Sequence, residues 1–151
     1  MSIQLDISKE KVMTEVFRQT GYIGSKTPTD DGNAYDAYSA TSDDRELLER
    51  YWREAINATA DQFKRFITII TPTNSGTPTE EIAINLTMPP RFDNTLTPTI
   101  QDALFSFFVN SIIGKWIVML DKDRAVLHNA DAANSMTEAL RQLYHQKPPT
   151  R

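Results

Sequence analysis

The feature that most limits the possible folds is a long apolar segment, residues 100–120, with the sequence IQDALFSFFVNSIIGKWIVML. One helical stripe runs along it at three- and four-residue steps: Ile100, Leu104, Phe107, Phe108, Ile112, Trp116, Met119 and Leu120. Further apolar residues cover much of the opposite surface: Phe105, Val109, Ile113, Ile117 and Val118. A helix that is apolar nearly all round is buried on all sides, by its own domain, by partner subunits or by lipid. We therefore expect a helix from Pro98 to about Leu120 with more apolar surface than one chain of this size can cover.

Lipid is the least favoured of these three environments. The apolar run is only about as long as the shortest membrane spans. Asn110 and Lys115 interrupt it, and an acidic segment, DKD, follows directly. Other parts of the chain also have apolar faces that need this helix as a partner. The sequence therefore predicts no membrane span.

Composition narrows the function classes. With 151 residues, 40% of them hydrophobic, the chain has the size of one domain with a single sizeable core. A formal net charge of −4 argues against electrostatic binding of nucleic acid, which needs clustered Lys and Arg. The absence of cysteine excludes disulfides and thiolate chemistry. The first residues lack the basic start and apolar run of a secretory signal.

Three further helices are predicted. The first begins after Ser8, a plausible N-cap, and ends at Gly21 and Gly24. The second begins with a capping-box pattern, Asp43 and Glu46, and carries one apolar face to about residue 66: Leu48, Trp52, Ala55, Thr59, Phe63 and Phe66. The last begins at Ser135 and Glu138 and has its own apolar face: Met136, Ala139, Leu140, Leu143 and Tyr144.

Between the second and third helices the hydrophobic period changes to that of strands. FITII is a β-branched run, and EIAINLTM alternates, with Ile82, Ile84, Leu86 and Met88 on one face. The intervening TPTNSGTPT carries turn residues between two Thr-Pro-Thr tripeptides, which we interpret as strand margins. Another copy begins at Thr97, whose hydroxyl is predicted to cap a helix that starts at Pro98.

These elements predict a mainly α fold, a helical bundle of about four helices with an inserted β-hairpin. We expect an N-terminal helix and polar acidic loop as an extension over residues 1–42. A helical domain over residues 43–145 follows, with the hairpin at 66–89, and then a flexible tail over 146–151.

Catalytic and metal-binding patterns are not visible. His128 is expected in a connection and His145 near a helix end, where it suits the helix dipole. No phosphate-binding glycine loop, HExxH or nucleophile-elbow pattern occurs. Asp30, Asp31 and Asp36 lack the spacing of a calcium loop. The sequence predicts no enzyme, no metal site and no cofactor.

Candidate contact residues come from three places. The hairpin tip is polar and has no apolar side chain to bury, which favours a contact role for Thr73, Asn74, Ser75 and Gly76. Tyr35 and Tyr38 lie in the polar loop, where they fit either an interface or a cover for the core. The apolar helix adds Phe105, Val109 and Trp116.

The order of the elements resembles that of the head–tail connector (adaptor) proteins of tailed bacteriophages over about residues 43–144. In that family a helix with a DD.LL pattern precedes a strand-containing insertion. A long helix that begins at proline then ends in aromatic and charged residues before a small terminal helix. The matching residues are Asp43, Asp44, Leu47 and Leu48 in the first feature, Pro98, Ala103, Trp116 and Arg124 in the second, and Leu140, Leu143 and Tyr144 in the third. Residues 1–42 are longer than the usual start of such proteins.

This resemblance implies a non-enzymatic virion structural protein, made in the host cytoplasm and located at the neck, the interface of head and tail. Many copies would form a homo-oligomeric ring beneath the portal, extend the DNA channel and dock other neck and tail proteins. An acidic lining suits DNA that passes through without sequence-specific binding. The residues alone leave two other classes open: a small helical protein-interaction or regulatory module of cellular origin, and an enzyme subunit whose site a partner completes.

Overall fold

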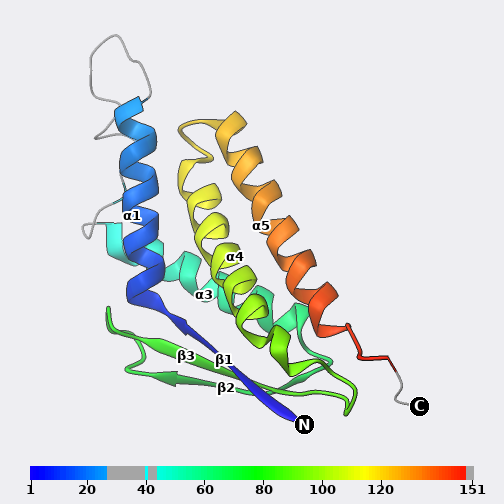
Figure 1. The fold of residues 1–151 in the computed structure, drawn as a ribbon. Helices are drawn as coiled ribbons and strands as arrows, with labels where there is room; N and C mark the ends of the chain where they lie inside the picture. Colours follow the sequence, from blue (N-terminus) through cyan, green and yellow to red (C-terminus); the bar gives the residue numbers. More distant parts are fainter. Residues whose placement is uncertain (27–39, 41–43, 149–151) are drawn as a thin grey trace.

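The computed structural model describes residues 1–26, 40 and 44–148. Along the chain the elements are β1 (Ser2–Ser8), α1 (Lys9–Lys26), α3 (Arg45–Gln62), β2 (Ile67–Thr73), β3 (Glu81–Thr87), the short 3-10 turn η2 (Asn94–Leu96), α4 (Thr97–Ile117) and α5 (Lys122–Leu143) (Figure 1). The mainly α class is confirmed, with four α-helices and a small antiparallel sheet in the described ranges.

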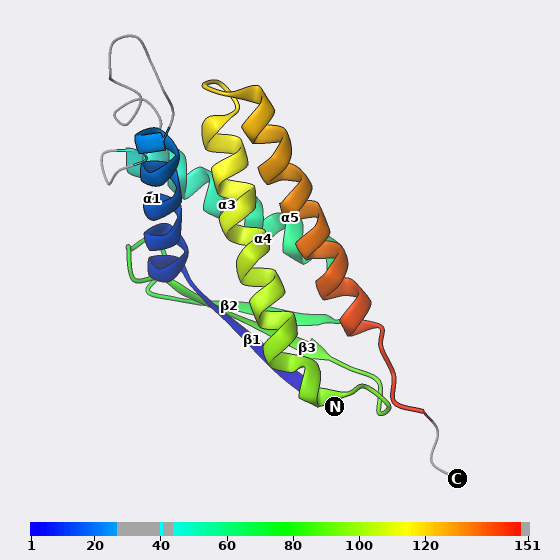
Figure 2. The ribbon, with the colours of Figure 1, turned by 45° about the horizontal axis from the view of Figure 1, so that its top comes forward.

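Helix α4 is the central element. It contacts α1, α3, α5 and β1, and α3 crosses behind the pair formed by α4 and α5 (Figure 2). Its buried residues lie on all sides: Ile100, Leu104, Phe107, Phe108, Val109, Ser111, Ile112, Ile113, Gly114 and Ile117. The chain thus buries most of this helix by itself. The expectation that neighbouring copies must cover it was wrong for residues 100–117, because three helices and a strand surround it.

The two polar residues that were noted as interruptions of the apolar run, Asn110 and Lys115, have partners in the same chain. The Lys115 ammonium lies 2.7 Å from Glu54 Oε2 on α3. Its hydrogen bond lowers the pKa of the Glu54 carboxyl. Asn110 Oδ1 lies 3.1 Å from His128 Nδ1 on α5. These residues therefore fix how α3 and α5 pack on α4.

The start and end of α4 differ from the prediction. Thr97 is the first helical residue and Leu96 holds the N-cap position, so the predicted cap by the Thr97 hydroxyl is absent. Asp93 instead caps the preceding turn, where its Oδ1 accepts a hydrogen bond from Thr95 N at 3.1 Å. Pro98 does lie in the first turn, as expected. The helix ends at Ile117, three residues before the predicted Leu120.

The sheet has the order β1-β3-β2, with both neighbours antiparallel to β3. The predicted hairpin of β2 and β3 is present, and its inward residues Ile82, Ile84 and Leu86 are buried. Strand β1 was not predicted. It pairs with β3 from Ser2 opposite Thr87 to Ser8 opposite Glu81, and it buries Leu5 and Ile7.

Helix α1 begins directly after Ser8, as predicted, and Ser8 Oγ accepts a hydrogen bond from Lys11 N at 3.4 Å. The helix does not end at Gly21 and Gly24, however, but continues to Lys26. Both glycines are buried, so tertiary packing outweighs their low helix propensity. Because β1 and α1 share the core with α3, α4 and α5, residues 1–26 are part of the domain and not an extension of it.

Helix α5 is much longer than predicted. It begins at Lys122, where Asp121 Oδ1 accepts a hydrogen bond from Arg124 N at 3.2 Å, and it runs through the segment that we expected to be a connection. Ser135 and Glu138 therefore lie inside the helix and do not start it. Gly114 explains the close packing of this segment, since a Cβ there would lie 2.2 Å from Asn129 Oδ1.

Two residues near the C-terminus, Gln146 and Lys147, are held by backbone contacts with Phe92 and Arg91. Gln146 forms an isolated bridge with Phe92. Lys147 N donates to Arg91 O at 2.8 Å, and Arg91 Nη2 donates to Lys147 O at 2.7 Å. The predicted flexible tail thus does not include residues 146 and 147, and residues 149–151 lie outside the described part.

Candidate functional site

The hairpin tip, residues 73–79, is the first candidate surface. All seven residues are exposed. Asn74 and Gly76 have positive φ angles of 55° and 80°, which turns the chain back toward β3. The tip lies against α3, since Arg53 Nη2 donates to Ser75 Oγ at 3.3 Å and Arg45 Nη2 approaches Gly76 O at 3.5 Å. Its outer side chains are therefore available for contacts, while its backbone is held on the domain.

A buried ion cluster anchors the tip from below. Glu80, 0% exposed, accepts hydrogen bonds from Trp52 Nε1 and Arg53 Nη2, both at 2.8 Å. Lys9, 4% exposed, lies 3.5 Å from Glu80 Oε2 and also pairs with Glu49. The Lys9 ammonium donates to Thr77 O at 3.3 Å as well. This cluster links α1, α3 and the hairpin. It could not be predicted from the sequence, because its members lie far apart in the chain.

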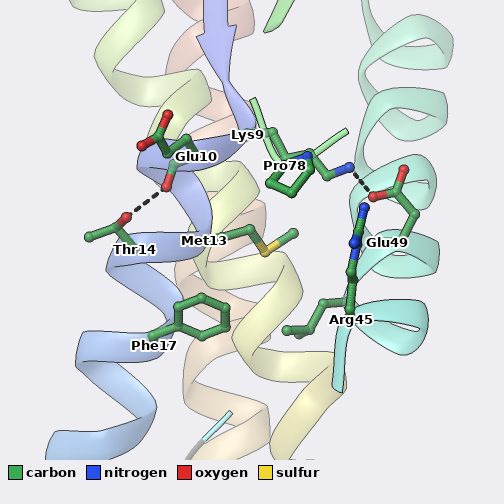
Figure 3. A pocket seen from close by; sticks show the side chains of 9 residues that line it. Lys9, Glu10, Met13, Thr14, Phe17, Arg45, Glu49 and Pro78 are labelled. Atoms are coloured by element: carbon green, nitrogen blue, oxygen red, sulfur yellow. Dashed lines mark hydrogen bonds and ion pairs between the residues drawn. The ribbon is translucent and has the colours of Figure 1, made fainter. Parts of the chain in front are cut away.

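A groove opens beside this cluster, between α1 and α3. Its cavity volume is about 180 Å³. Figure 3 shows Met13 and Phe17 extending from α1 toward α3, with Pro78 of the hairpin at one end. Leu48 completes the apolar lining. The polar lining residues are Lys9, Glu10, Thr14, Arg45 and Glu49. An apolar cavity of about 150 Å³ holds a benzene molecule, so this groove can take one apolar side chain.

The second candidate surface is the apolar turn, which we define as Val118, Met119, Val126 and Leu127. It lies where α4 ends and α5 begins, at the end of these helices far from the sheet (Figure 1). All four side chains are among the exposed large hydrophobic residues of the described chain, and Met119 is 92% exposed. Because exposed apolar side chains are typical of contact sites when they gather on a surface, the apolar turn is a candidate contact surface.

The predicted contact residues are not brought together. Thr73, Asn74, Ser75 and Gly76 lie at the exposed tip. Phe105 and Trp116 are partly buried and pack against the core. Val109 is only 3% exposed, because it lies within the helical core, so its prediction as a contact residue was wrong. Tyr35 and Tyr38, and the acidic residues Asp30, Asp31, Asp36 and Asp43, lie outside the described residues.

The two histidines occupy different settings. The prediction that His128 lies in a connection was wrong, because His128 lies within α5. The partner of its imidazole is Asn110. Burial lowers the pKa of the His128 imidazole; Asp131 opposes this shift and Arg124 adds to it. His145 follows the last helix, where His145 N donates to Gln142 O at 3.2 Å.

Residues 1–26, 40 and 44–148 contain neither a candidate metal site nor a candidate membrane span. These residues include no cluster of three or more His, Asp or Glu able to hold a metal ion. Within the same ranges, no helix combines the length and the hydropathy that crossing a bilayer requires. Comparison with protein-family models, with curated proteins and with solved structures finds no match to the chain.

Proposed function

We propose that this chain is a non-enzymatic structural protein of a tailed-phage virion, a head–tail connector that forms a ring beneath the portal. The observation that carries the proposal is the order of its elements. A helix beginning just after two aspartates, α3, leads into a hairpin, then into a long helix with proline in its first turn, α4, and finally into α5. The order agrees with the connector pattern that the sequence resembles as far as α4, whereas α5, with 22 residues, is longer than the small terminal helix of that pattern.

The exposed surfaces support an assembly role. The hairpin tip and the apolar turn lie on different parts of one domain, so a copy can contact two neighbours through different surfaces. Contacts of this kind, between unlike surfaces of identical chains, close into rings or extend into filaments. The net charge of −4 is compatible with DNA that passes through the ring without being held.

One observation favours the second candidate, a small helical interaction module. Helix α4 is covered by its own chain, so the domain has the core of a protein that folds alone. The two candidates differ in their assembly state. A module of this kind stays small at any concentration, whereas a connector joins a portal ring in many copies.

Analytical ultracentrifugation with the portal protein encoded in the same genome separates the candidates. We expect the chain to co-sediment with the portal in a complex of fixed, high copy number. A chain that sediments separately from the portal at all mixing ratios would exclude the connector function and favour the interaction module.

A further inference from the structure

Lysine and arginine side chains gather at one end of the domain, where α3 and α5 end and the chain passes before η2 (Figure 1, Figure 2). We define the basic end as Lys64, Arg65, Arg91, His145 and Lys147, all of which are exposed. We infer that the basic end of each copy contacts the phosphate backbone of duplex DNA. This inference rests on the proposed connector function, because it names the surface of each copy that faces the DNA channel.

Contacts between three segments hold these residues side by side. The Arg65 guanidinium lies over the Tyr144 ring, 5.7 Å from its centre, and Tyr144 packs edge-to-face on Phe66 at 5.1 Å. Arg91 Nε and Nη2 both donate to Lys147 O, at 3.1 and 2.7 Å. Both guanidinium groups are therefore held in place and keep further N–H donors. Such preorganisation lowers the entropy that is lost when they contact a phosphate.

Two acidic residues lie at the same end, and they do not cancel its charge. Asp61 Oδ1 lies 3.8 Å from Lys64 Nζ, with both side chains largely exposed. Hydrogen bonds from Thr95 lower the pKa of the Asp93 carboxyl, and the nearby Lys147 lowers it further. Four lysine and arginine side chains against two carboxylates leave this end with a net charge of +2. Because the whole chain carries −4, the remaining residues carry −6.

The charge of the basic end is available to a ligand. In the described part of the chain, Arg65, Arg91 and Lys147 form no ion pair. Tyr144, 52% exposed, adds a hydroxyl group, and tyrosine hydroxyls also donate to phosphate oxygens in protein–DNA complexes. The net charge of −4, which argues against nucleic-acid binding, is an average over the chain and does not describe this end.

Other exposed cations have a different setting. Lys11 and Lys122 also lack an ion pair in the described residues. However, Lys11 follows Glu10, and Lys122 lies between Asp121 and Asp123. An acidic protein repels DNA except where its charge is locally reversed, so a contact with DNA is expected at the basic end and not at these two lysines.

Three cations without an ion pair predict a weak contact that depends strongly on salt. Each phosphate that a protein neutralises adds about 0.9 to the slope of log affinity against log salt concentration. Contacts with about three phosphates therefore weaken roughly 40-fold between about 50 and 200 mM salt. Phosphate contacts carry no sequence information. Contacts of this kind guide a duplex along a channel without holding it at one sequence.

Nuclear magnetic resonance of the full, isotope-labelled chain tests the inference, because it detects weak binding residue by residue. The probe is a short DNA duplex of mixed sequence, added at low salt. We expect the largest amide shifts at Arg65, Arg91 and residues 144–147, and a roughly 40-fold weaker affinity at about 200 mM salt. Arg65→Glu combined with Lys147→Glu should remove these shifts. The fold should remain intact, because Lys147 holds the C-terminal residues through its backbone atoms and not through its side chain.

The matched control is Lys11→Glu combined with Lys122→Glu, which changes the net charge equally at two exposed cations outside the basic end. This control should keep most of the shift at the basic end. The contact would be overturned by the absence of shifts in the natural chain, by shifts centred elsewhere, or by equal losses in the two double variants.

Co-sedimentation with the portal separates a DNA contact from a protein contact. The variant with Glu at positions 65 and 147 should still co-sediment with the portal. Loss of co-sedimentation would assign the basic end to a protein partner and overturn the inference. If the natural chain co-sediments with the portal but shows no shifts with DNA, only this inference fails. Shifts without co-sedimentation reject only the connector function.

Discussion

At the scale of single residues, the buried carboxylate of Glu80 is the most consequential side chain. It holds Trp52, Arg53 and Lys9 in one cluster beneath the hairpin. Removing one partner of a buried ion pair leaves the other charge without compensation, which costs about 3–5 kcal/mol. We expect Glu80→Ala to lower the free energy of unfolding by that amount in urea titrations. Glu81→Ala is the matched control, because Glu81 is exposed on β3; equal effects of the two changes would refute the role of the cluster.

The two tryptophans should differ in their contribution to stability. Trp52 is fully buried and packs edge-to-face on Phe108 at a ring distance of 5.2 Å. Its replacement by alanine should cost about 3–5 kcal/mol, as for other buried aromatic residues. Trp116 is only partly buried, so Trp116→Ala should cost less. Urea unfolding of both variants measures this difference, and a larger loss at Trp116 would contradict the packing described here.

His128 gives the stability of the fold a pH dependence. Burial holds the pKa of its imidazole below the usual 6.5, so the folded state binds fewer protons than the unfolded state between the two values. The contribution of His128 is therefore fully present above about pH 6.5 and is lost as the pH falls through the lower folded-state pKa. The urea midpoint should fall between pH 7 and pH 5 more steeply in the natural chain than in His128→Gln. Parallel profiles would show that His128 does not cause the dependence.

At the scale of elements, the buried residues are predicted best for those helices and strands that place only one face against the core. Helix α3 and strand β3 have such faces, and their buried residues match the predicted ones: Leu48, Trp52, Ala55 and Thr59 on α3, and Ile82, Ile84 and Leu86 on β3. The first part of α5 was missed because Asn129, Asp131 and Asn134 favour turns in isolation. Two features account for the helix there: the Asp121 cap at its start and the close packing of Asn129 on Gly114, which is visible only in three dimensions.

Strand β1 and the contact surfaces could not be predicted from the sequence, for a different reason. The alternation of Ile3, Leu5 and Ile7 is too short to indicate a strand without its partner β3. The tip was correctly placed between two strands, but its anchor depends on Lys9 and Arg53, which are distant in the chain. Side chains gathered from several elements form the groove and the ion cluster, and spacing in one segment does not reveal them.

The hairpin tip provides a test at this scale. Deleting Asn74–Gly76 removes exposed residues and leaves the Glu80 cluster in place, so we expect the fold to remain intact. The same deletion should weaken assembly, because the tip is a predicted contact surface. Circular dichroism measures the first effect and co-sedimentation with the portal the second. A loss of helical signal would mean that the tip is needed for folding.

At the scale of the whole molecule, the burial of α4 changes the reason for expecting an assembly. The core is complete within one copy for residues 100–117, so copies are not needed to finish the fold. Assembly instead depends on surfaces outside the core, namely the hairpin tip, the groove and the apolar turn. A preformed domain of this kind can be made as a separate copy and added to a ring without refolding.

The most direct test of this account is electron microscopy of the purified chain mixed with the products of the neighbouring genes, the portal among them. The account predicts closed rings of uniform copy number attached to the portal, with the central opening continuous with its channel. Fields that contain only single copies or small discrete complexes, with bare portals beside them, would contradict it.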